Sequence, residues 1–236
     1  MSKPIKRKFF KNTAIVSVFT MLSRIFGYIR DAAMFIFISN TSGALDSFFV
    51  AFRIPNFFRR IFGEGALSTA YIPVLSDYKN GSTKDDVKDF INSSITTITI
   101  ILMIVSIIGV LIAPVLIYMI APGFVNSEFG QYDLSVNLLK ITFPYMMFIC
   151  LTALAGSILN TYDNFAYPAI TPVILNLSLI ISVLFVAPYF EEPVFALAWG
   201  LLIGGIIQLS FQIYPIAKLG LLPKFKINIK HPGLKK

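Results

Sequence analysis

Six long stretches of the chain are mainly apolar, and short polar segments separate them. The clearest is 90–121, which is rich in isoleucine, leucine, valine and threonine and contains no charged residue. A helix needs about 20 mainly apolar residues to cross a hydrocarbon core of roughly 30 Å. The pattern therefore predicts six transmembrane helices, over 12–39, 42–78, 90–121, 138–160, 168–188 and 194–218.

Charge in the connecting segments alternates in step with these six helices. Five, three and six basic residues lie in the segments 1–11, 77–89 and 218–236, respectively. The segments 39–46, 121–137 and 188–193 would lie on the other side of the membrane, and their charged residues are all acidic. Because basic loops stay in the cytoplasm, both chain ends should be cytoplasmic. We expect a basic tail (1–11), an all-α transmembrane bundle (12–220) and a basic cytoplasmic segment (221–236).

Composition supports a membrane protein and excludes several other classes. The chain has 236 residues, of which 56% are hydrophobic and 14% charged, against about 25% charged in soluble domains. The net charge of +8 would suit nucleic acid, but the basic residues of the tails flank apolar helices. One cysteine, Cys150, and one histidine, His231, build neither a disulfide framework nor a metal cluster. No catalytic motif is visible, so we expect neither an enzyme nor a cofactor.

The third, fifth and sixth helices have the composition of ordinary lipid-facing spans, with Gly200, Gly204 and Gly205 allowing close helix packing. The first helix is different because charged residues interrupt it. Arg24 lies about 18 Å from the cytoplasmic end, near the middle of the bilayer, and Arg30 and Asp31 follow toward the outer side.

The second helix carries more charge at the same depths. At 100° per residue, a band about 40° wide contains four charged residues, Asp46, Arg53, Arg60 and Glu64. Arg59 points about 120° away from that band. A continuous helix over 42–78 would be about 55 Å long, so it must break, tilt or project into the cytoplasm. Pro55 and the pair Gly63 and Gly65 are the expected break points.

Five arginines at membrane depth need partners, because each costs at least about 2.5–3.5 kcal/mol at the centre of the bilayer. One alternative is pairing with nearby carboxylates, as Arg60–Glu64, Arg30–Asp31 and Arg53–Asp46. Three acids cannot neutralise five arginines, and guanidinium groups match phosphate oxygens well. The surplus predicts a membrane cavity for a phosphate-bearing, lipid-linked substrate. Lys140 either snorkels to the interface or lines that cavity.

Four sequence blocks resemble the N-terminal half of the MurJ/MviN lipid II flippases. They are "SRIFGYIRDA" (23–32), "DSFFVAFRIPNFFRRIFGEGALSTAYIPVL" (46–75), "LKITFPY" (139–145) and "SILNTYDNFAYPAITP" (157–172). The resemblance covers almost the whole chain. It implies alternating-access export of undecaprenyl-pyrophosphate-linked peptidoglycan precursor across the bacterial inner membrane. The chain would be one lobe of a two-lobe flippase, as a fragment, a truncation or the product of a split gene.

The resemblance also implies roles for individual residues. Arg24, Arg30 and Arg59 match arginines expected to contact the pyrophosphate, and Arg53 and Arg60 would support them electrostatically. Polar cavity positions are matched by Asp31, Asp46 and Asn56. The cytoplasmic gate position is matched by Glu64. The implied partners are lipid II, membrane lipids and a C-terminal lobe. Two alternatives stay open, a related polyprenyl-linked glycan exporter and a non-transporting membrane scaffold.

Overall fold

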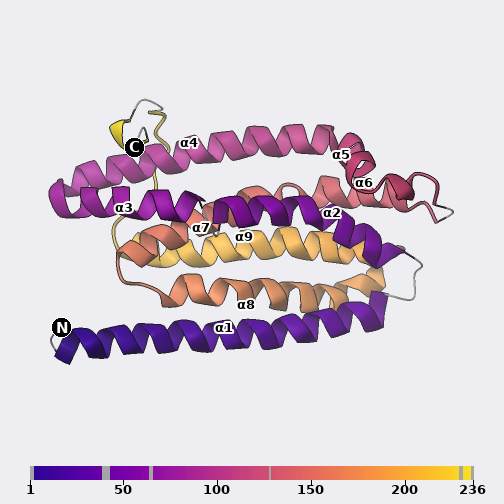
Figure 1. The fold of residues 1–236 in the computed structure, drawn as a ribbon, viewed down its shortest axis with the longest axis horizontal. Helices are drawn as coiled ribbons and strands as arrows, with labels where there is room; N and C mark the ends of the chain where they lie inside the picture. The colour runs from indigo at the N-terminus through magenta and orange to yellow at the C-terminus, as the bar shows by residue number, and fades with distance from the viewer. Residues whose placement is uncertain (1–2, 39–42, 64–65, 128, 229–230, 235–236) are drawn as a thin grey trace.

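The fold is a bundle of long helices that run side by side (Figure 1). The structure is a computed structural model that describes residues 3–38, 43–63, 66–127, 129–228 and 231–234. All the regular secondary structure in those ranges is helical. The first helix, α1 (Lys3–Ile38), is continuous and includes most of the basic tail that we expected to precede it. It packs along α8, and both lie at one edge of the bundle in Figure 1.

The second predicted helix is broken, which is one of the three outcomes that its length allowed. It consists of α2 (Ala44–Phe58), a π-helical turn η1 (Arg59–Gly63) and α3 (Ala66–Gly81). Pro55 stays inside α2, so the regular α-helix ends just after the proline, and the chain then widens into the π turn. Such turns are frequent at functional sites, and this one begins with Arg59.

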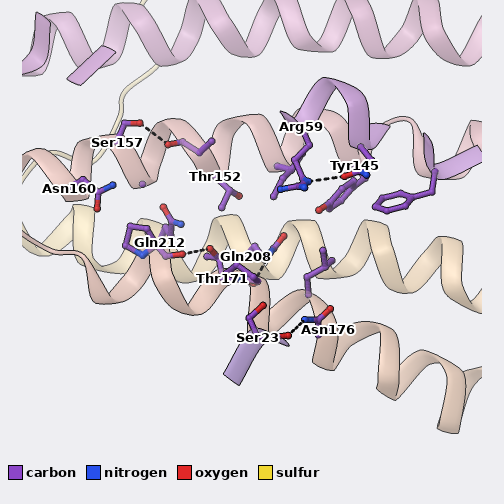
Figure 2. A pocket seen from close by; sticks show the side chains of 18 of the residues that line it. Ser23, Arg59, Tyr145, Thr152, Ser157, Asn160, Thr171, Asn176, Gln208 and Gln212 are labelled. Carbon is purple, nitrogen blue, oxygen red and sulfur yellow. Dashed lines mark hydrogen bonds between the residues drawn. The ribbon is translucent and has the colours of Figure 1, made fainter. Parts of the chain in front are cut away.

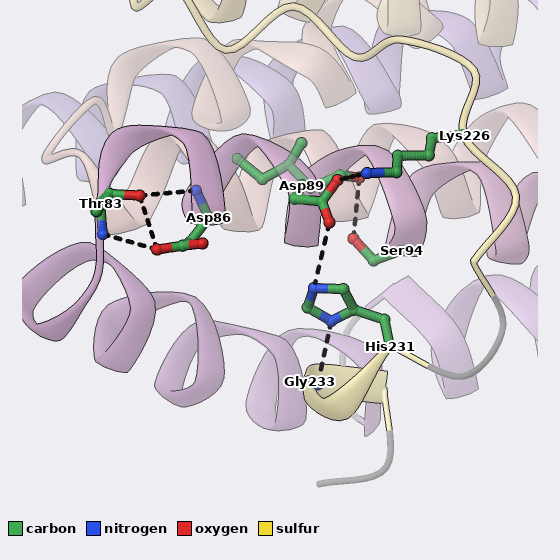
Figure 3. A network of polar contacts seen from close by, with 8 residues as sticks. Thr83, Asp86, Asp89, Ser94, Lys226, His231 and Gly233 are labelled. Carbon is green, nitrogen blue, oxygen red and sulfur yellow. Dashed lines mark hydrogen bonds and ion pairs between the residues drawn. The ribbon is translucent and has the colours of Figure 1, made fainter.

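The predicted loop 77–89 is wrong, because helices occupy most of it. In the second half of this segment, Thr83 caps the start of α4 (Lys84–Leu111), as Figure 3 shows. The Thr83 hydroxyl accepts a hydrogen bond from the Asp86 backbone N–H, and the Asp86 carboxylate accepts one from the Thr83 backbone N–H. This reciprocal pair satisfies backbone donors that a helix start otherwise leaves unpaired. The helix therefore starts before the apolar run that we used to place it.

The third, fourth and fifth predicted helices are each divided into shorter segments, with a proline at the first two breaks. After α4 come α5 (Ala113–Ile120), with Pro114 in its first turn, and a short 3-10 turn η2 (Pro122–Phe124). The fourth predicted helix is a pair, α6 (Gln131–Thr142) and α7 (Tyr145–Thr161), joined at Pro144. The fifth consists of α8 (Ala166–Ile181), the π turn η3 (Ser182–Val186) and the 3-10 turn η4 (Ala187–Tyr189). The sixth prediction matches α9 (Val194–Lys218).

Four helical segments of the described chain are long and apolar enough to cross a membrane. They are Lys84–Leu111, Gln131–Thr161, Ala166–Tyr189 and Val194–Lys218, which correspond to the third to sixth predicted helices. The first two predicted helices carry the arginines and are not among these four. The count of six crossings therefore stays a prediction.

The glycines of α9 let this helix approach its neighbours closely, which confirms that prediction. A Cβ at Gly200 would overlap Ser182 Oγ, and one at Gly204 would lie 2.9 Å from Leu175 Cδ1. On another face, a Cβ at Gly205 would lie 2.7 Å from the ring of Tyr145. Since α9 packs against both α7 and α8, these positions hold together the helices that form the cavity described below.

The C-terminal segment folds back onto the start of α4, and it lies at the same end of the bundle as the start of α1 (Figure 1). The Lys226 ammonium pairs with the Asp89 carboxylate. His231 is buried, and its ring lies near those of Tyr78 and Phe90, with centroids 5.8 and 5.7 Å away. Figure 3 shows Lys226 and His231 both reaching toward Asp89. These contacts tie the segment to the bundle.

Candidate substrate cavity

A cavity of about 560 Å³ lies among the helices, and six elements line it: α1, α2, η1, α7, α8 and α9 (Figure 2). Of the residues that the structure describes, the charged ones lining it are Arg30 and Arg59. The other lining side chains are amides, hydroxyls, prolines and apolar groups. The cavity therefore combines two guanidinium groups with a neutral wall.

Arg30 is held from two sides. Its Nε and Nη2 donate to Asp31 Oδ1 at 2.9 and 2.7 Å, and its Nη1 donates to Asn176 Oδ1 at 2.9 Å. Asn176 is itself fixed, because its Nδ2 donates to the Ser23 carbonyl oxygen at 2.9 Å. The amide of Asn176 thus joins α8 to α1 and holds the guanidinium at the cavity wall (Figure 2 shows the Asn176–Ser23 bond). The predicted pair Arg30–Asp31 is confirmed.

Arg59 opens the π turn and reaches the same cavity from another side of the bundle. Its Nε donates to Asn56 Oδ1 at 3.0 Å, so the polar side chain of one helical turn orients the cation of the next. Figure 2 shows Arg59 beside Tyr145, whose ring is fully buried. Arg30, Asn56 and Arg59 come from three elements, and the fold brings them into one cavity.

The other predicted site residues lie elsewhere. None of Arg24, Asp31, Asp46, Arg53 and Arg60 lines the cavity, and all five are exposed in this chain. Among the described ion pairs there is none between Arg53 and Asp46. Glu64, together with its predicted pairing with Arg60, lies outside the described residues.

Two further residues that the sequence analysis named, Lys140 and Cys150, are not among those that line the cavity. Lys140 is exposed and does not line this cavity. Cys150 is buried, as is common for a free cysteine, which packs like a small apolar residue.

Sequence reasoning missed the amides of the later helices, because α8 and α9 looked like ordinary lipid-facing spans. Asn176 is 6% exposed, and Gln208 and Gln212 are each 1% exposed; all three line the cavity. The signal was present in the sequence: Gln208 and Gln212 are four residues apart, on one face of an otherwise apolar helix. A pair of amides at that spacing indicates a polar face.

Comparison with known proteins gives the family. The family model described as lipid II flippase MurJ matches residues 36–236. The chain belongs to the lipid II flippase MurJ family. A probable lipid II flippase MurJ of Buchnera aphidicola subsp. Schizaphis graminum is 41% identical over 224 residues, or 95% of this chain and 43% of that relative. The lipid II flippase MurJ of Burkholderia cenocepacia is 38% identical over 234 residues, or 96% of this chain and 44% of that relative.

The fold agrees with this family. A solved structure titled lipid II flippase MurJ, inward closed conformation, superposes with a TM-score of 0.75 at 32% identity. The match covers 92% of this chain and 44% of that structure. The chain thus spans less than half the length of the MurJ proteins that it matches.

Proposed function

We propose that this chain is the N-terminal lobe of a flippase that moves lipid II, the undecaprenyl-pyrophosphate-linked peptidoglycan precursor, across the bacterial cytoplasmic membrane by alternating access. One observation carries the proposal: Arg30 and Arg59, from separate elements, face one cavity whose other lining residues are neutral. Guanidinium forks bind phosphate oxygens in pairs, and a site shielded from bulk water strengthens the contact. The diphosphate of the substrate supplies the matching anion.

The exposed arginines are consistent with an aqueous space that a second lobe would close. Arg24, Arg53 and Arg60 are exposed in this chain, and arginine at membrane depth cannot face lipid without a large cost. In the proposal they line a wider aqueous space between this lobe and a C-terminal lobe, with Asp31 and Asp46 as neighbouring polar groups and Glu64 at the cytoplasmic gate. Substrate would meet these side chains on its way to or from the cavity that Arg30 and Arg59 line.

The proposed topology has six crossings, over residues 12–220, with a basic cytoplasmic tail before them and the cytoplasmic segment 221–236 after them. Two observations support it. Four helical segments meet the length and hydropathy that a crossing needs, and the start of α1 lies at the same end of the bundle as the C-terminal segment (Figure 1). An even number of crossings would place both ends of the chain on the same side of the membrane.

Lipid II exposure in cells tests the function. The full-length protein should be the sole flippase of the strain, in wild-type form or as Arg30→Ala or Arg59→Ala, and outer-leaflet lipid II is then labelled. Losing charge-assisted hydrogen bonds, which contribute about 1.5–3 kcal/mol, should lower export about tenfold or more and stop growth. Lys84→Ala is the matched control, because it removes an exposed cation at the start of α4. Normal export and growth in both arginine variants would contradict the proposal.

A further inference from the structure

The cavity continues from its arginines into a neutral part, which we call the glutamine arm and define by Thr171, Gln208 and Gln212. Figure 2 shows Arg59 and Tyr145 at one end of the view, Asn160 and Ser157 at the other, and the two glutamines between them. The glutamines come from α9 and Thr171 comes from α8. The arm is therefore built from helices other than those that supply Arg30 and Arg59.

Three buried polar atoms near the arginines and in the arm have no hydrogen-bond partner in the described part of the chain. They are Gln208 Oε1, Gln212 Oε1 and the Tyr145 hydroxyl. The three side chains are at most 1% exposed. An unpaired buried polar atom is costly, and native proteins leave few of them. Three atoms of this kind around one cavity indicate that a ligand or water completes their hydrogen bonding.

The orientation of one amide is fixed by the fold. Gln208 Nε2 donates to the Thr171 carbonyl oxygen at 2.6 Å. Turning this amide over would place two oxygens against each other, so Gln208 Oε1 remains the atom that needs a donor. The arm therefore offers hydrogen-bond acceptors without formal charge, held in place by a backbone contact.

These features select the chemical class of the ligand. A metal or ammonium ion would be repelled by Arg30 and Arg59, which line the same cavity. A hydrocarbon chain would leave the buried oxygens unpaired. A neutral group with several O–H and N–H donors satisfies them, and a sugar carries such groups. The whole cavity, at about 560 Å³, lies within the range of about 300–1,000 Å³ that is usual for small-molecule sites.

We propose that the glutamine arm binds the hydroxyl and acetamido groups of a sugar joined directly to the diphosphate. This inference rests on the proposed function, because it needs the diphosphate at Arg30 and Arg59 to place the sugar in the arm. It adds a means of selection: the arginines hold any polyprenyl diphosphate, and the glutamines favour one that carries a sugar.

Gly156 gives the arm its room. A Cβ at this position of α7 would lie 3.5 Å from Gln212 Oε1 and 3.4 Å from Pro168 Cβ, an ordinary contact distance. Gly156→Ala should therefore fold, and alanine is the better helix former. Its methyl group would occupy space directly in front of the Gln212 amide.

Two lipids that differ only in the sugar test the inference in the full-length protein. One is undecaprenyl diphosphate, and the other is the same lipid carrying one N-acetylhexosamine. In Gln212→Leu and Gln208→Leu, the Kd for the sugar-bearing lipid should rise about tenfold, as expected for a lost hydrogen bond that leaves its partner unpaired. The Kd for the bare lipid should change less than twofold. Gly156→Ala should raise the Kd for the sugar-bearing lipid by a smaller factor and leave the Kd for the bare lipid within twofold of the wild-type value.

The matched control is Ser210→Ala, on an exposed face of the same helix, which should bind both lipids as the wild type does. An unchanged preference in the glutamine variants would mean that only water fills the arm and would overturn the inference. Equal losses for both lipids would also overturn it, because the glutamines would then act through the fold. If the wild type binds neither lipid, the proposed function itself fails.

Discussion

Asn176 should act on substrate through Arg30. Its Oδ1 accepts from Arg30 Nη1 and its Nδ2 donates to the Ser23 carbonyl, each at 2.9 Å. Leucine in its place keeps a similar volume but holds neither group. The guanidinium, still bonded to the exposed Asp31, would then have to be ordered when the ligand binds. Ordering a long side chain costs about 0.5–1.5 kcal/mol, which is about a twofold to tenfold rise in Kd.

The assay is the affinity of the full-length protein for undecaprenyl diphosphate, measured for Asn176→Leu, Arg30→Ala and the double variant. If Asn176 works through Arg30, Asn176→Leu should raise Kd when Arg30 is present. When Arg30 is already alanine, adding Asn176→Leu should change Kd by less than twofold. Ser178→Ala is the matched control, because it removes a hydrogen bond that the same helix makes to the Gly200 carbonyl of α9. Additive losses in the double variant would refute the reasoning.

Two further predictions concern stability. Gly200→Ala should lower the free energy of unfolding by about 1–3 kcal/mol, because the added Cβ would overlap Ser182 Oγ. Gly81→Ala should leave the free energy of unfolding unchanged, because nothing lies within 4 Å of the added Cβ. Equal thermal midpoints for the two variants would contradict this prediction. Asp89→Asn should weaken the hold on Lys226, whose backbone N–H exchange should quicken up to about fivefold, as expected for a half-exposed ion pair. Exchange as slow as in the wild type would show that the ion pair does not hold the segment.

Part of the fold and of the site could be predicted from the sequence, because it depends on apolar length, residue size and the cost of desolvating charge. The bounds of α9 follow from its apolar length, and the role of its glycines follows from their small size. Desolvation requires arginines at membrane depth to find polar surroundings, and two of the arginines that we predicted at that depth, Arg30 and Arg59, face one cavity. The length of the second predicted helix required it to break, tilt or project into the cytoplasm, and the structure shows that it breaks.

The rest depends on how helices are rotated against each other. Arg24 and Arg30 lie on one helix, but α1 meets α8 on the face that brings Arg30 to Asn176, and sequence spacing does not fix that contact. The glutamines of α9 could not be assigned to a cavity for the same reason. The start of α4 was misplaced because the capping pair at Thr83 outweighs the polarity of the first turn.

The central claim is that Arg30 and Arg59 together hold a diphosphate. The most direct measurement is the Kd of the full-length protein for undecaprenyl diphosphate, with Arg30→Ala, Arg59→Ala and the double variant compared with Lys84→Ala. We predict that each single arginine variant raises Kd about tenfold or more and that the double variant binds more weakly still, while Lys84→Ala binds as the wild type does. Wild-type affinity in the double variant would contradict the claim.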